Sequence, residues 1–433
     1  MLSASELIAS IPSNFKKDLE FISKQIQEAG KESFIIGGSV RDLILGKNPH
    51  EYDLATSMMP EETKKKFKRV IETGIQHGTV TVMLGDNGYE ITTYRKDIDY
   101  TDGRRPDKTE FGATLSEDMK RRDFTMNAIA LDIVSERLID ENHGIEDIKN
   151  KIIRTIGNPL DRFGEDGLRP IRAIRFQASL GFSIDPETYS AIYKTRHITE
   201  KISRERFHDE LNKILIADHA STGLWELYKN KIFELFSKVN LKQNLSEENI
   251  KSIEKLSLAP LGLRLAFLLH WLLEEKDILN GAEQFLKEIR YSKAITKDCL
   301  FYLETFLFQY DIQKINIFET RKFLSKVVTY TGIREMDSVL KGLLSYFKIL
   351  FDRSVFSEFE ASIQTIIESK NPLVLKELAV NGNQIIAKFP NIDKRTLGTL
   401  LNEILNRVLE FPEENNVESI YNFVSNKHKE LNV

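Results

Sequence analysis

The chain has 433 residues, enough for two to four domains of roughly 150 residues each. Hydrophobic residues make up 41% and charged residues 29%, which is ordinary for a globular protein and excludes collagen-like, low-complexity and grossly disordered classes. The net charge of −4 argues against a chain coated in positive charge for indiscriminate nucleic-acid binding, but it leaves room for a local basic groove.

Cysteine content and the apolar runs bear on the protein's location. Cys299 is the only cysteine, so the chain cannot form an intramolecular disulfide, and one thiol cannot build a zinc site alone. The chain does not open with a basic segment followed by an apolar one, and no apolar run approaches the roughly 18 residues of a membrane-spanning helix. We therefore expect a cytoplasmic protein without a membrane partner.

Strand and helix patterns mix over the first 158 residues or so. Phe34 to Ile36 is a short apolar run that predicts a strand, and it stops at two glycines. Val40 to Leu45 then has a helical pattern, and Tyr52 to Thr56 predicts a second strand. Strand, glycine turn and helix in this order indicate an α/β arrangement.

A hairpin is expected next. Thr79 to Leu84 and Tyr89 to Tyr94 predict two strands that are joined through Asp86-Asn87-Gly88. Asn-Gly between alternating apolar runs is among the strongest local hairpin signals. We therefore place the turn at these three residues.

Helical spacing dominates from about Asp161 onward. Leu261, Leu265, Leu268 and Leu272, for example, recur at intervals of three or four residues, while strand signals nearly vanish. No internal repeat of 20 to 50 residues is obvious, so a solenoid is not expected. The predicted fold class is α+β, with a small mixed-sheet head followed by a long all-helical remainder.

The glycine turn has the parts of a triphosphate cradle. Gly37 and Gly38 allow a ligand to approach the backbone closely, Ser39 offers a hydroxyl, and Arg41 offers a cation. The alternative is an ordinary tight turn in which Arg41 pairs with a nearby surface carboxylate. A glycine pair by itself does not decide between the two interpretations.

Carboxylates on neighbouring strands predict a metal site. Glu51 and Asp53 share one face of a strand because strand side chains alternate, and Glu90 lies on another predicted strand. Converging carboxylates repel one another unless a cation separates them, and Mg²⁺ prefers such hard oxygen ligands. Two metals could activate a 3′ hydroxyl and hold a leaving pyrophosphate. The alternative is an exposed strand face with a solvated charge beside the hairpin.

Two further motifs combine arginine with aspartate. Arg121 and Arg122 can fork onto phosphate or ribose oxygens, and Asp123 can accept hydrogen bonds from ribose hydroxyls. Glu165 and Asp166 precede Arg169 by four and three residues, so on a helix all three side chains can share one face. The alternatives are a basic turn in which Asp123 is a local cap, and an ordinary helical salt bridge.

These blocks occur in an order that resembles the class II tRNA nucleotidyltransferases, the bacterial-type CCA-adding enzymes of the poly(A) polymerase family. The resemblance is dense from about residue 34 to 215 and thins to a helical pattern further on. The matching stretches are GGSVRDLILG, EYDLAT, HGTVTV, YEITTYR, DYTDGRRPD, RRDFTMNAIALD, GIEDIKNKIIRTIG, EDGLRPIRAIRF and ISRERFHDEL.

The resemblance implies addition of CCA to the 3′ end of tRNA from CTP and ATP, with two Mg²⁺ ions. It also implies a polymerase-β-like head (1–158), a neck (159–223), a body (224–360) and a tRNA-binding tail (361–433). Metal ligands would be Glu51 and Asp53, with Glu90 as third catalytic carboxylate. The nucleotide would bind Gly37, Gly38, Ser39, Arg41, Arg122, Asp123, Asn127, Asp166, Arg169, Arg172 and Arg175. The flexible loop would contain Asp102, Arg104, Arg105 and Asp107.

Asp166 and Arg169 would take the place of a nucleic-acid template. Cytosine and adenine each carry an amine donor beside a ring nitrogen acceptor, which suits a carboxylate and a guanidinium. Guanine and uracil present the reversed pattern, and unpaired buried polar groups reject a ligand strongly. One Asp–Arg pair could thus accept C and A and refuse G and U.

The chain departs from the family pattern in three places. Glu51 stands where the family usually has Asp, so the geometry of metal ligation can shift. Gly167 and Pro170 are unusual in the base-reading block, and Pro170 requires a helix that begins shortly before it. His270-Trp271 replaces the His-Asp pair of some relatives, so phosphohydrolase activity is not expected.

Several related functions stay open. A poly(A) polymerase would tend to carry a basic C-terminal extension, which this chain lacks, and a CC-only enzyme typically lacks the loop that Asp99 to Asp107 resembles. An enzyme that adds only the final A would keep both features of this chain. A non-catalytic RNA-binding relative would not need three clustered carboxylates.

Overall fold

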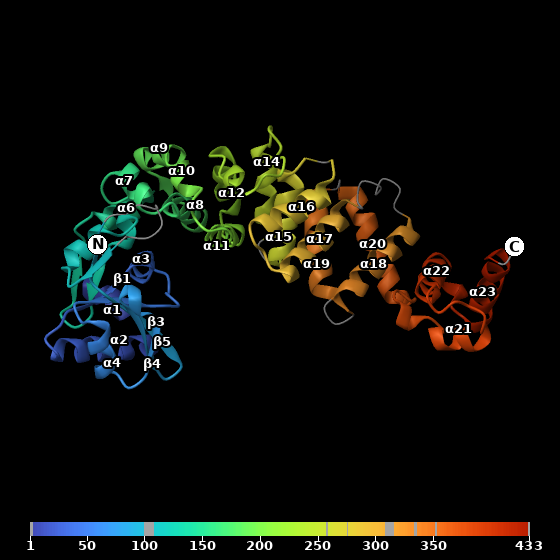
Figure 1. Ribbon diagram of the computed structural model, residues 1–433, viewed down its shortest axis with the longest axis horizontal. Helices are drawn as coiled ribbons and strands as arrows, with labels where there is room; N and C mark the ends of the chain where they lie inside the picture. The colour runs from blue at the N-terminus through green and yellow to red at the C-terminus, as the bar shows by residue number, and fades with distance from the viewer. Residues whose placement is uncertain are drawn as a thin grey trace. The chain divides into compact units, whose positions relative to one another are not determined.

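The protein is represented by a computed structural model, in which residue contacts divide the chain into two units. The N-terminal unit comprises residues 1–241 and 284–291, and the C-terminal unit comprises residues 242–283 and 292–433 (Figure 1). The structure describes residues 3–98, 108–256, 259–274, 276–307, 316–332, 336–350 and 353–431.

Seven short strands of the N-terminal unit form one mixed sheet in the order β3-β4-β5-β2-β1-β8-β9. β2 and β5 run parallel, whereas the other neighbouring pairs are antiparallel. The strands expected from the sequence are present as β1, β2, β4 and β5. The bounds are β1 (Ser33–Ile36), β2 (Asp53–Thr56), β3 (Val70–Gly74), β4 (Thr79–Leu84), β5 (Asn87–Thr93), β8 (Ala130–Asp132) and β9 (Arg137–Ile139).

The β4–β5 hairpin is present, but its turn lies at Gly85-Asp86 rather than at the predicted Asp86-Asn87-Gly88. Leu84 pairs with Asn87, so Asn87 and Gly88 already belong to β5. Gly85 has a φ of +60°, and two-residue hairpin loops favour glycine where the first residue needs a positive φ. The turn therefore forms at Gly85-Asp86 and not at the neighbouring Asn87-Gly88.

Helices pack on the sheet close to the strand ends. α1 (Ala4–Ser10) and α2 (Ser13–Glu28) come first, and the helix expected after the glycine pair is α3 (Gly38–Ile44). α2 and α3 pack against β1, whose four residues are all buried, and α4 (Pro60–Lys66) packs against β4. One buried apolar cluster of this region comprises Phe34, Ile36, Ala55, Tyr94, Met119, Ala128, Ala130 and Ile156.

Short elements lie between the strands of the sheet and between the sheet and the helices that follow it. α8 is the centre of this helical part, because it packs against both α11 and α12. The connecting elements are η1 (Ile75–His77), β6 (Arg95–Ile98), β7 (Lys108–Phe111), α5 (Leu115–Lys120), η2 (Thr125–Asn127), α6 (Gly144–Asn150) and β10 (Ile152–Ile153). The helical part contains α7 (Pro159–Glu165), α8 (Arg169–Leu180), β11 (Ser183–Ile184), α9 (Pro186–Lys194), α10 (Arg196–Thr199), α11 (Arg204–Leu215), α12 (Ala220–Lys229) and α13 (Phe233–Phe236).

The helix expected to run continuously through Glu165, Asp166 and Arg169 is broken, so that expectation is wrong. α7 ends at Glu165, Asp166 is extended, and α8 begins at Arg169. A Cβ on Gly167 would lie 2.5 Å from the carbonyl oxygen of Ile198, so the α10 backbone leaves room there for glycine alone. Pro170 falls in the first turn of α8, where its missing N–H costs nothing.

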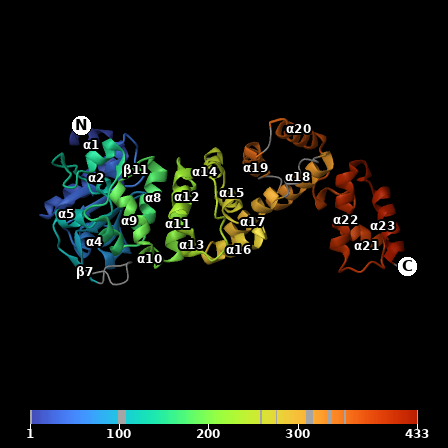
Figure 2. The same ribbon diagram turned by 90° about the horizontal axis from the view of Figure 1, so that it is seen from above.

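The C-terminal unit is helical throughout the residues that the structure describes. α15 packs against α17, and α18 packs against α19, α20 and α22 (Figure 2). The last residues of α16 belong to the N-terminal unit. The bounds are α14 (Glu247–Lys251), η3 (Ser252–Leu256), α15 (Leu261–Leu272), α16 (Ile278–Glu288), α17 (Lys293–Leu307), α18 (Ile317–Thr331), α19 (Met336–Leu350), α20 (Arg353–Ser369), η5 (Leu375–Glu377), α21 (Gly382–Lys388), α22 (Leu397–Glu410), η6 (Pro412–Glu414) and α23 (Val417–Leu431).

The architecture matches the expected fold class. Among the described residues, every strand lies in the N-terminal unit, and the helical texture predicted after Asp161 is confirmed apart from the two-residue strand β11. None of the helices in the described part of the chain combines the length and the apolar character needed to span a bilayer.

Candidate active site

Predicted carboxylates meet where β2 begins. Asp53 is the first residue of β2, and the parallel register places it directly beside Glu90 of β5. Tyr52 is buried with 1% of its surface exposed, whereas Glu51, Asp53 and Glu90 are all exposed. The sheet thus presents a pair of carboxylates from adjacent strands. Glu51 lies before β2 rather than on it, so the prediction that Glu51 and Asp53 share one face of a strand is wrong.

The charge around Asp53 is unbalanced. Partial burial among the neighbouring segments raises the pKa of Asp53 to about 6, and repulsion from Glu90 and Glu51 adds to the rise. The guanidinium of Arg122 opposes this effect without cancelling it. An excess of negative charge at this position favours binding of a cation.

The glycine turn lies against this carboxylate. Gly37 has a φ of +83° and directly precedes α3. A Cβ on Gly37 would lie 3.7 Å from Nη1 of Arg122 and 3.9 Å from Oδ2 of Asp53, so the turn approaches both charged groups closely. Ser39 is buried, and its hydroxyl donates to the carbonyl of Ile36 at 3.2 Å. The Ser39 hydroxyl, which was predicted to form part of a triphosphate cradle, thus donates its hydrogen bond within the turn.

Asp118 is a buried carboxylate that the sequence analysis missed. Its Oδ1 accepts hydrogen bonds from Arg121, and its Oδ2 accepts hydrogen bonds from Arg122. Burial alone would raise the pKa of Asp118, but the two guanidiniums lower it below its ordinary value. The spacing of three and four residues on a short helix is a local signal that could have revealed these pairs.

Asp123 is held by protein donors on both oxygens. Oδ1 accepts hydrogen bonds from the backbone N–H of Phe124 at 2.8 Å and from Asn127 at 3.2 Å, and Oδ2 pairs with Arg172 at 2.6 Å. Asn127 in turn accepts a hydrogen bond from Nη1 of Arg41 at 2.9 Å. Burial would raise the pKa of Asp123, but Arg172 and Asn127 outweigh it and lower the pKa to about 2. Asp123 is therefore ionised under all ordinary conditions.

Three guanidiniums lie against the ring of Phe176, and the sequence analysis did not predict this cluster. The Cζ atoms of Arg175, Arg41 and Arg172 lie 3.6, 5.2 and 5.4 Å from the ring centroid. Arg175 also donates to buried Glu210 at 2.8 Å. Cation–π contact and this ion pair hold a dense cluster of arginines beside the glycine turn. Arg41 and Glu210 come from segments distant in the sequence, whereas Arg172 and Arg175 lie on α8 with Phe176, four residues and one residue before it.

Asp166 and Arg169, the predicted base-reading residues, lie close in the chain but bond elsewhere. Oδ2 of Asp166 pairs with Arg206 at 3.0 Å. Arg169 is mostly buried, and it donates to Glu165 at 2.6 Å and to the backbone carbonyl of Arg121 at 2.9 Å. The salt bridge of the alternative interpretation is thus present, with Glu165 as the partner. Each carboxylate oxygen of Asp166 retains a second lone pair for a ligand.

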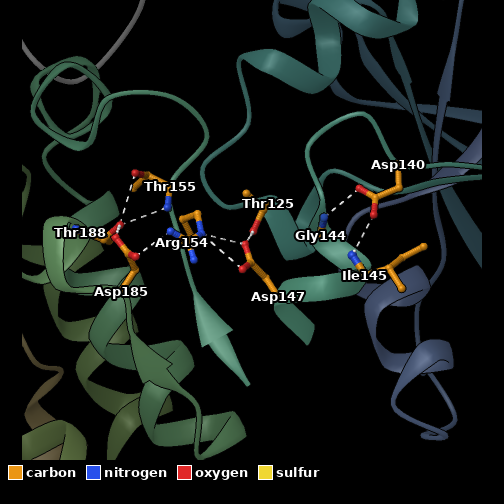
Figure 3. A network of polar contacts seen from close by, with 9 residues as sticks. All are labelled: Thr125, Asp140, Gly144, Ile145, Asp147, Arg154, Thr155, Asp185 and Thr188. Carbon is orange, nitrogen blue, oxygen red and sulfur yellow. Dashed lines mark hydrogen bonds and ion pairs between the residues drawn. The ribbon is translucent and has the colours of Figure 1, made fainter. Parts of the chain in front are cut away.

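A network of polar contacts joins η2 to α6, Arg154 and the start of α9. Figure 3 shows Arg154 between Asp147 and Asp185, with Nη1 of Arg154 2.7 Å from Oδ1 of Asp185. Thr125 donates from its hydroxyl to Asp147 at 2.7 Å (Figure 3). A Cβ on Gly144 would lie 2.2 Å from the carbonyl oxygen of Thr125, so α6 packs tightly against this segment. The network ties η2, which contains Asn127, to the start of α9.

The predicted loop residues Asp102, Arg104, Arg105 and Asp107 lie outside the residues that the structure describes. The strands on either side, β6 and β7, are antiparallel and pair from Arg95 with Phe111 to Ile98 with Lys108. The assignment of these residues to a flexible loop accordingly stays a prediction.

The carboxylates suit a metal ion that shares its ligands with a substrate. In the parts of the chain that the structure describes, no group of three or more His, Cys, Asp or Glu side chains forms a ready-made metal site. Within the same residues, no hydrogen bond or ion pair engages the side chains of Glu51, Asp53 or Glu90. Accessible, mutually repelling oxygens of this kind fit a hard divalent cation whose remaining ligands are water and phosphate.

Comparison with known proteins agrees with the geometry. Residues 33–154 match the family model of the poly A polymerase head domain, and residues 181–239 match the "probable RNA and SrmB-binding site of polymerase A". The CCA-adding enzyme of Ligilactobacillus salivarius is 46% identical over 228 residues, covering 53% of this chain and 56% of that enzyme.

Other similarities extend over the whole chain. The crystal structure of the Bacillus stearothermophilus CCA-adding enzyme in complex with CTP has a TM-score of 0.75 and 26% identity, and covers 98% of this chain and 100% of that one. The CCA-adding enzyme of Streptococcus pneumoniae strain R6 is 34% identical over 423 residues, covering 97% of this chain and 99% of that enzyme. The chain therefore belongs to the family of CCA-adding enzymes, as the sequence motifs predicted.

Proposed function

We propose that this protein adds C, C and A in turn to the 3′ end of tRNA, using CTP and ATP and no nucleic-acid template. One observation carries the proposal: the parallel register of β2 and β5 places Asp53 and Glu90 side by side, next to the Gly37 turn and Arg122. Full-length similarity to CCA-adding enzymes supports it and gives no preference to poly(A) polymerase. A tRNA substrate is consistent with action in the cytoplasm, which we propose as its location.

The carboxylates prepare the reaction. Enzymes of this family use divalent metal ions, and we propose two Mg²⁺ ions held by Glu51 and Asp53, with Glu90 as an additional carboxylate. Bound there, the metal would lower the pKa of the attacking 3′ hydroxyl and neutralise the leaving pyrophosphate. Asp53 must be ionised for this role, and its pKa of about 6 places that transition just below neutral pH. Glu51 has one methylene more than Asp and would hold the same cation from just before β2.

The nucleotide would be held by two groups of residues. The backbone of Gly37 and Gly38, together with Arg122, would hold the triphosphate, because the glycines carry no side chain of their own and the guanidiniums of Arg122 and Arg41 lie close to them. Arg41 and Arg172 fix Asn127 and Asp123, which are proposed to meet the ribose hydroxyls. We propose that Arg175 contributes to nucleotide binding through its positive charge.

Asp166 and Arg169 are proposed to select the base. Asp166 would accept from the amine of C or A, while Arg169 donates to the neighbouring ring nitrogen. The ion pair with Arg206 orients Asp166, and Glu165 with the Arg121 carbonyl orients Arg169. Both residues would then read a base from fixed positions, which is the condition for discrimination between isosteric ligands.

The helical remainder is proposed to bind tRNA, with a neck at 159–223, a body at 224–360 and a tail at 361–433 after the head at 1–158. A cleft of about 680 Å³ in the C-terminal unit supports this role. It is lined by Lys297, Lys322, Lys326, Asn402 and Asn406, among other residues. Ammonium groups and amides of this kind suit the phosphates and 2′ hydroxyls of RNA.

The test uses three RNAs with purified wild-type protein, Mg²⁺, CTP and ATP. The RNAs are a tRNA without its CCA end, a tRNA lacking only the final A, and an unstructured RNA of equal length. We expect CCA on the first, A on the second, and little addition to the third. A product from the second RNA alone would identify an A-only enzyme, and long poly(A) on the third would identify a poly(A) polymerase.

A further inference from the structure

The Asp118 carboxylate has an unusual set of partners for a residue outside the proposed ligand-binding groups. It is fully buried at 0% exposure, near the end of α5. Oδ1 accepts from Nε and Nη2 of Arg121 at 2.9 and 2.7 Å, and from the backbone N–H of Arg95 at 3.3 Å. Oδ2 accepts from Nε and Nη2 of Arg122 at 3.3 and 3.1 Å. One buried anion therefore fixes two adjacent guanidiniums and the first residue of β6.

The two arginines lead to different halves of the active site. Arg122 turns its remaining nitrogen, Nη1, toward the Gly37 turn, where its charge also reaches Asp53. Arg121 uses its backbone instead, since its carbonyl accepts from Nη2 of Arg169 at 2.9 Å. The dipeptide Arg121-Arg122 thus contacts the phosphate side with a side chain and the base-reading side with a carbonyl.

We propose that Asp118 is a positioning residue that couples nucleotide binding to base selection. It holds the Arg122 guanidinium beside the Gly37 turn and the Arg121 carbonyl against Arg169, although it touches no substrate itself. The inference rests on the proposed function, because it assigns Arg169 to base reading. A displacement of the Arg121-Arg122 turn would disturb both halves of the site together.

A merely structural ion pair would behave differently, and the chain offers a matched control. Asp132 at the end of β8 is also buried, at 2% exposure. It accepts from the backbone N–H groups of Val134 and Ser135 at 3.0 Å and pairs with Arg137 at 3.2 Å. Its partners lie in the β8–β9 turn and on β9, and none of them contacts the proposed nucleotide-binding residues. Loss of its charge reports the cost of removing a buried, arginine-paired carboxylate.

The experiment compares Asp118→Asn with Asp132→Asn by steady-state kinetics with CTP, ATP, UTP and GTP, and by thermal unfolding. We expect both variants to lower Tm. Asp118→Asn should in addition raise KM for CTP and ATP about 10- to 100-fold, the range typical when a residue that holds a ligand-binding group in place is removed. Its preference for CTP and ATP over UTP and GTP should fall about tenfold, while Asp132→Asn keeps wild-type KM and preference.

Equal KM and base preference in the two variants would overturn the proposal, as would an Asp118→Asn enzyme that loses only kcat. Asp118→Glu keeps the charge and guards against a variant that does not fold. It should restore the base preference at least partly, and a Glu variant as indiscriminate as the Asn variant would count against positioning by charge. Failure of the wild type to add CCA would instead refute the proposed function, independently of Asp118.

Discussion

Two groups of carboxylates lie in the same part of the N-terminal unit and have opposite electrostatic surroundings. Asp53 stands among Glu90 and Glu51 with Arg122 as a single opposing charge, and its pKa is raised to about 6. Asp123, by contrast, is surrounded by arginine and amide donors that bring its pKa down to about 2. The negative charge of the first group is not neutralised by the protein and is available to bind a cation. The negative charge of the second group is neutralised by arginine and amide donors of the protein. Charge balance thus separates ligand-binding carboxylates from those that organise the site.

The most severe test of this contrast is Asp53→Asn. Loss of a metal ligand worth several kcal/mol should lower kcat/KM for CTP by about 1000-fold or more. Glu51→Asp is the matched conservative change, and activity should change but survive. Quench-flow or gel-based single-nucleotide addition measures both. Substantial activity in Asp53→Asn would remove Asp53 from the metal site.

The same variant tests the raised pKa through stability. Because the folded-state pKa of Asp53 lies above the usual 3.8, the folded protein binds the extra proton between about pH 4 and 6. Its contribution to stability is present at low pH and is lost as pH rises through about 6. Relative to Asp53→Asn, the metal-free wild type should lose Tm over this window, and its divalent-metal affinity should weaken as pH falls below about 6. Parallel Tm curves would contradict the assignment.

Base selection is the next largest expected effect. Asp166→Ala removes the acceptor for an exocyclic amine and the repulsion against carbonyl-bearing bases. The preference for CTP and ATP over UTP and GTP should fall about 10- to 100-fold, with chemistry still measurable because the Asp53 site is untouched. kcat/KM for all four nucleotides provides the measurement. An equal loss of kcat/KM for all four nucleotides, with their rank order unchanged, would show that Asp166 serves only in the salt bridge with Arg206.

A smaller effect is expected from the aromatic centre of the arginine cluster. Phe176→Leu removes cation–π contacts to three guanidiniums, each worth roughly 0.5 to 2 kcal/mol, so KM for CTP and ATP should rise about three- to tenfold. Phe207→Leu is the control, since the equally buried Phe207 ring stacks on Phe236 at 4.0 Å instead. Both variants should lose Tm. Equal KM changes would show that Phe176 only fills space.

The sequence predicted the parts of the site that depend on short-range geometry. Alternation and the hairpin signal predicted the strands that carry Asp53 and Glu90, because strand periodicity is local. The parallel pairing of β2 with β5, which places the two residues side by side, is a long-range contact that these patterns do not give. Glu210 and the contact of Phe176 with Arg41 were missed because the partners come from distant segments, although Arg172 and Arg175 lie beside Phe176 on α8. Asp118 was missed for another reason: its spacing to Arg121 and Arg122 is common on solvated helices, and only its complete burial distinguishes it. The break after Glu165 is indicated locally by Pro170, whereas the close contact of Gly167 with the α10 backbone comes from a distant segment.

The smallest expected effect concerns RNA binding in the C-terminal unit, where two of the cleft lysines, Lys322 and Lys326, are already paired with acids. Nζ of Lys326 lies 2.9 Å from Oε1 of Glu304, and both side chains are partly exposed. An exposed pair of this kind adds little to stability, so Lys326→Gln and Glu304→Gln should leave Tm nearly unchanged. If the cleft binds RNA phosphates, the two changes should have opposite effects on tRNA affinity.

Lys326→Gln should weaken tRNA binding about two- to fivefold and reduce the slope of log K against log salt by about 0.7 to 0.9, as expected for one lost phosphate contact. Glu304→Gln should tighten binding, because it frees Lys326 and removes a repelling carboxylate. Fluorescence anisotropy of labelled tRNA at several salt concentrations measures both. Lys341 on α19, which does not line the cleft, provides the matched lysine control. If Lys326→Gln and Glu304→Gln shift tRNA affinity in the same direction, the ion pair stabilises the packing of the helices and does not regulate contact with RNA.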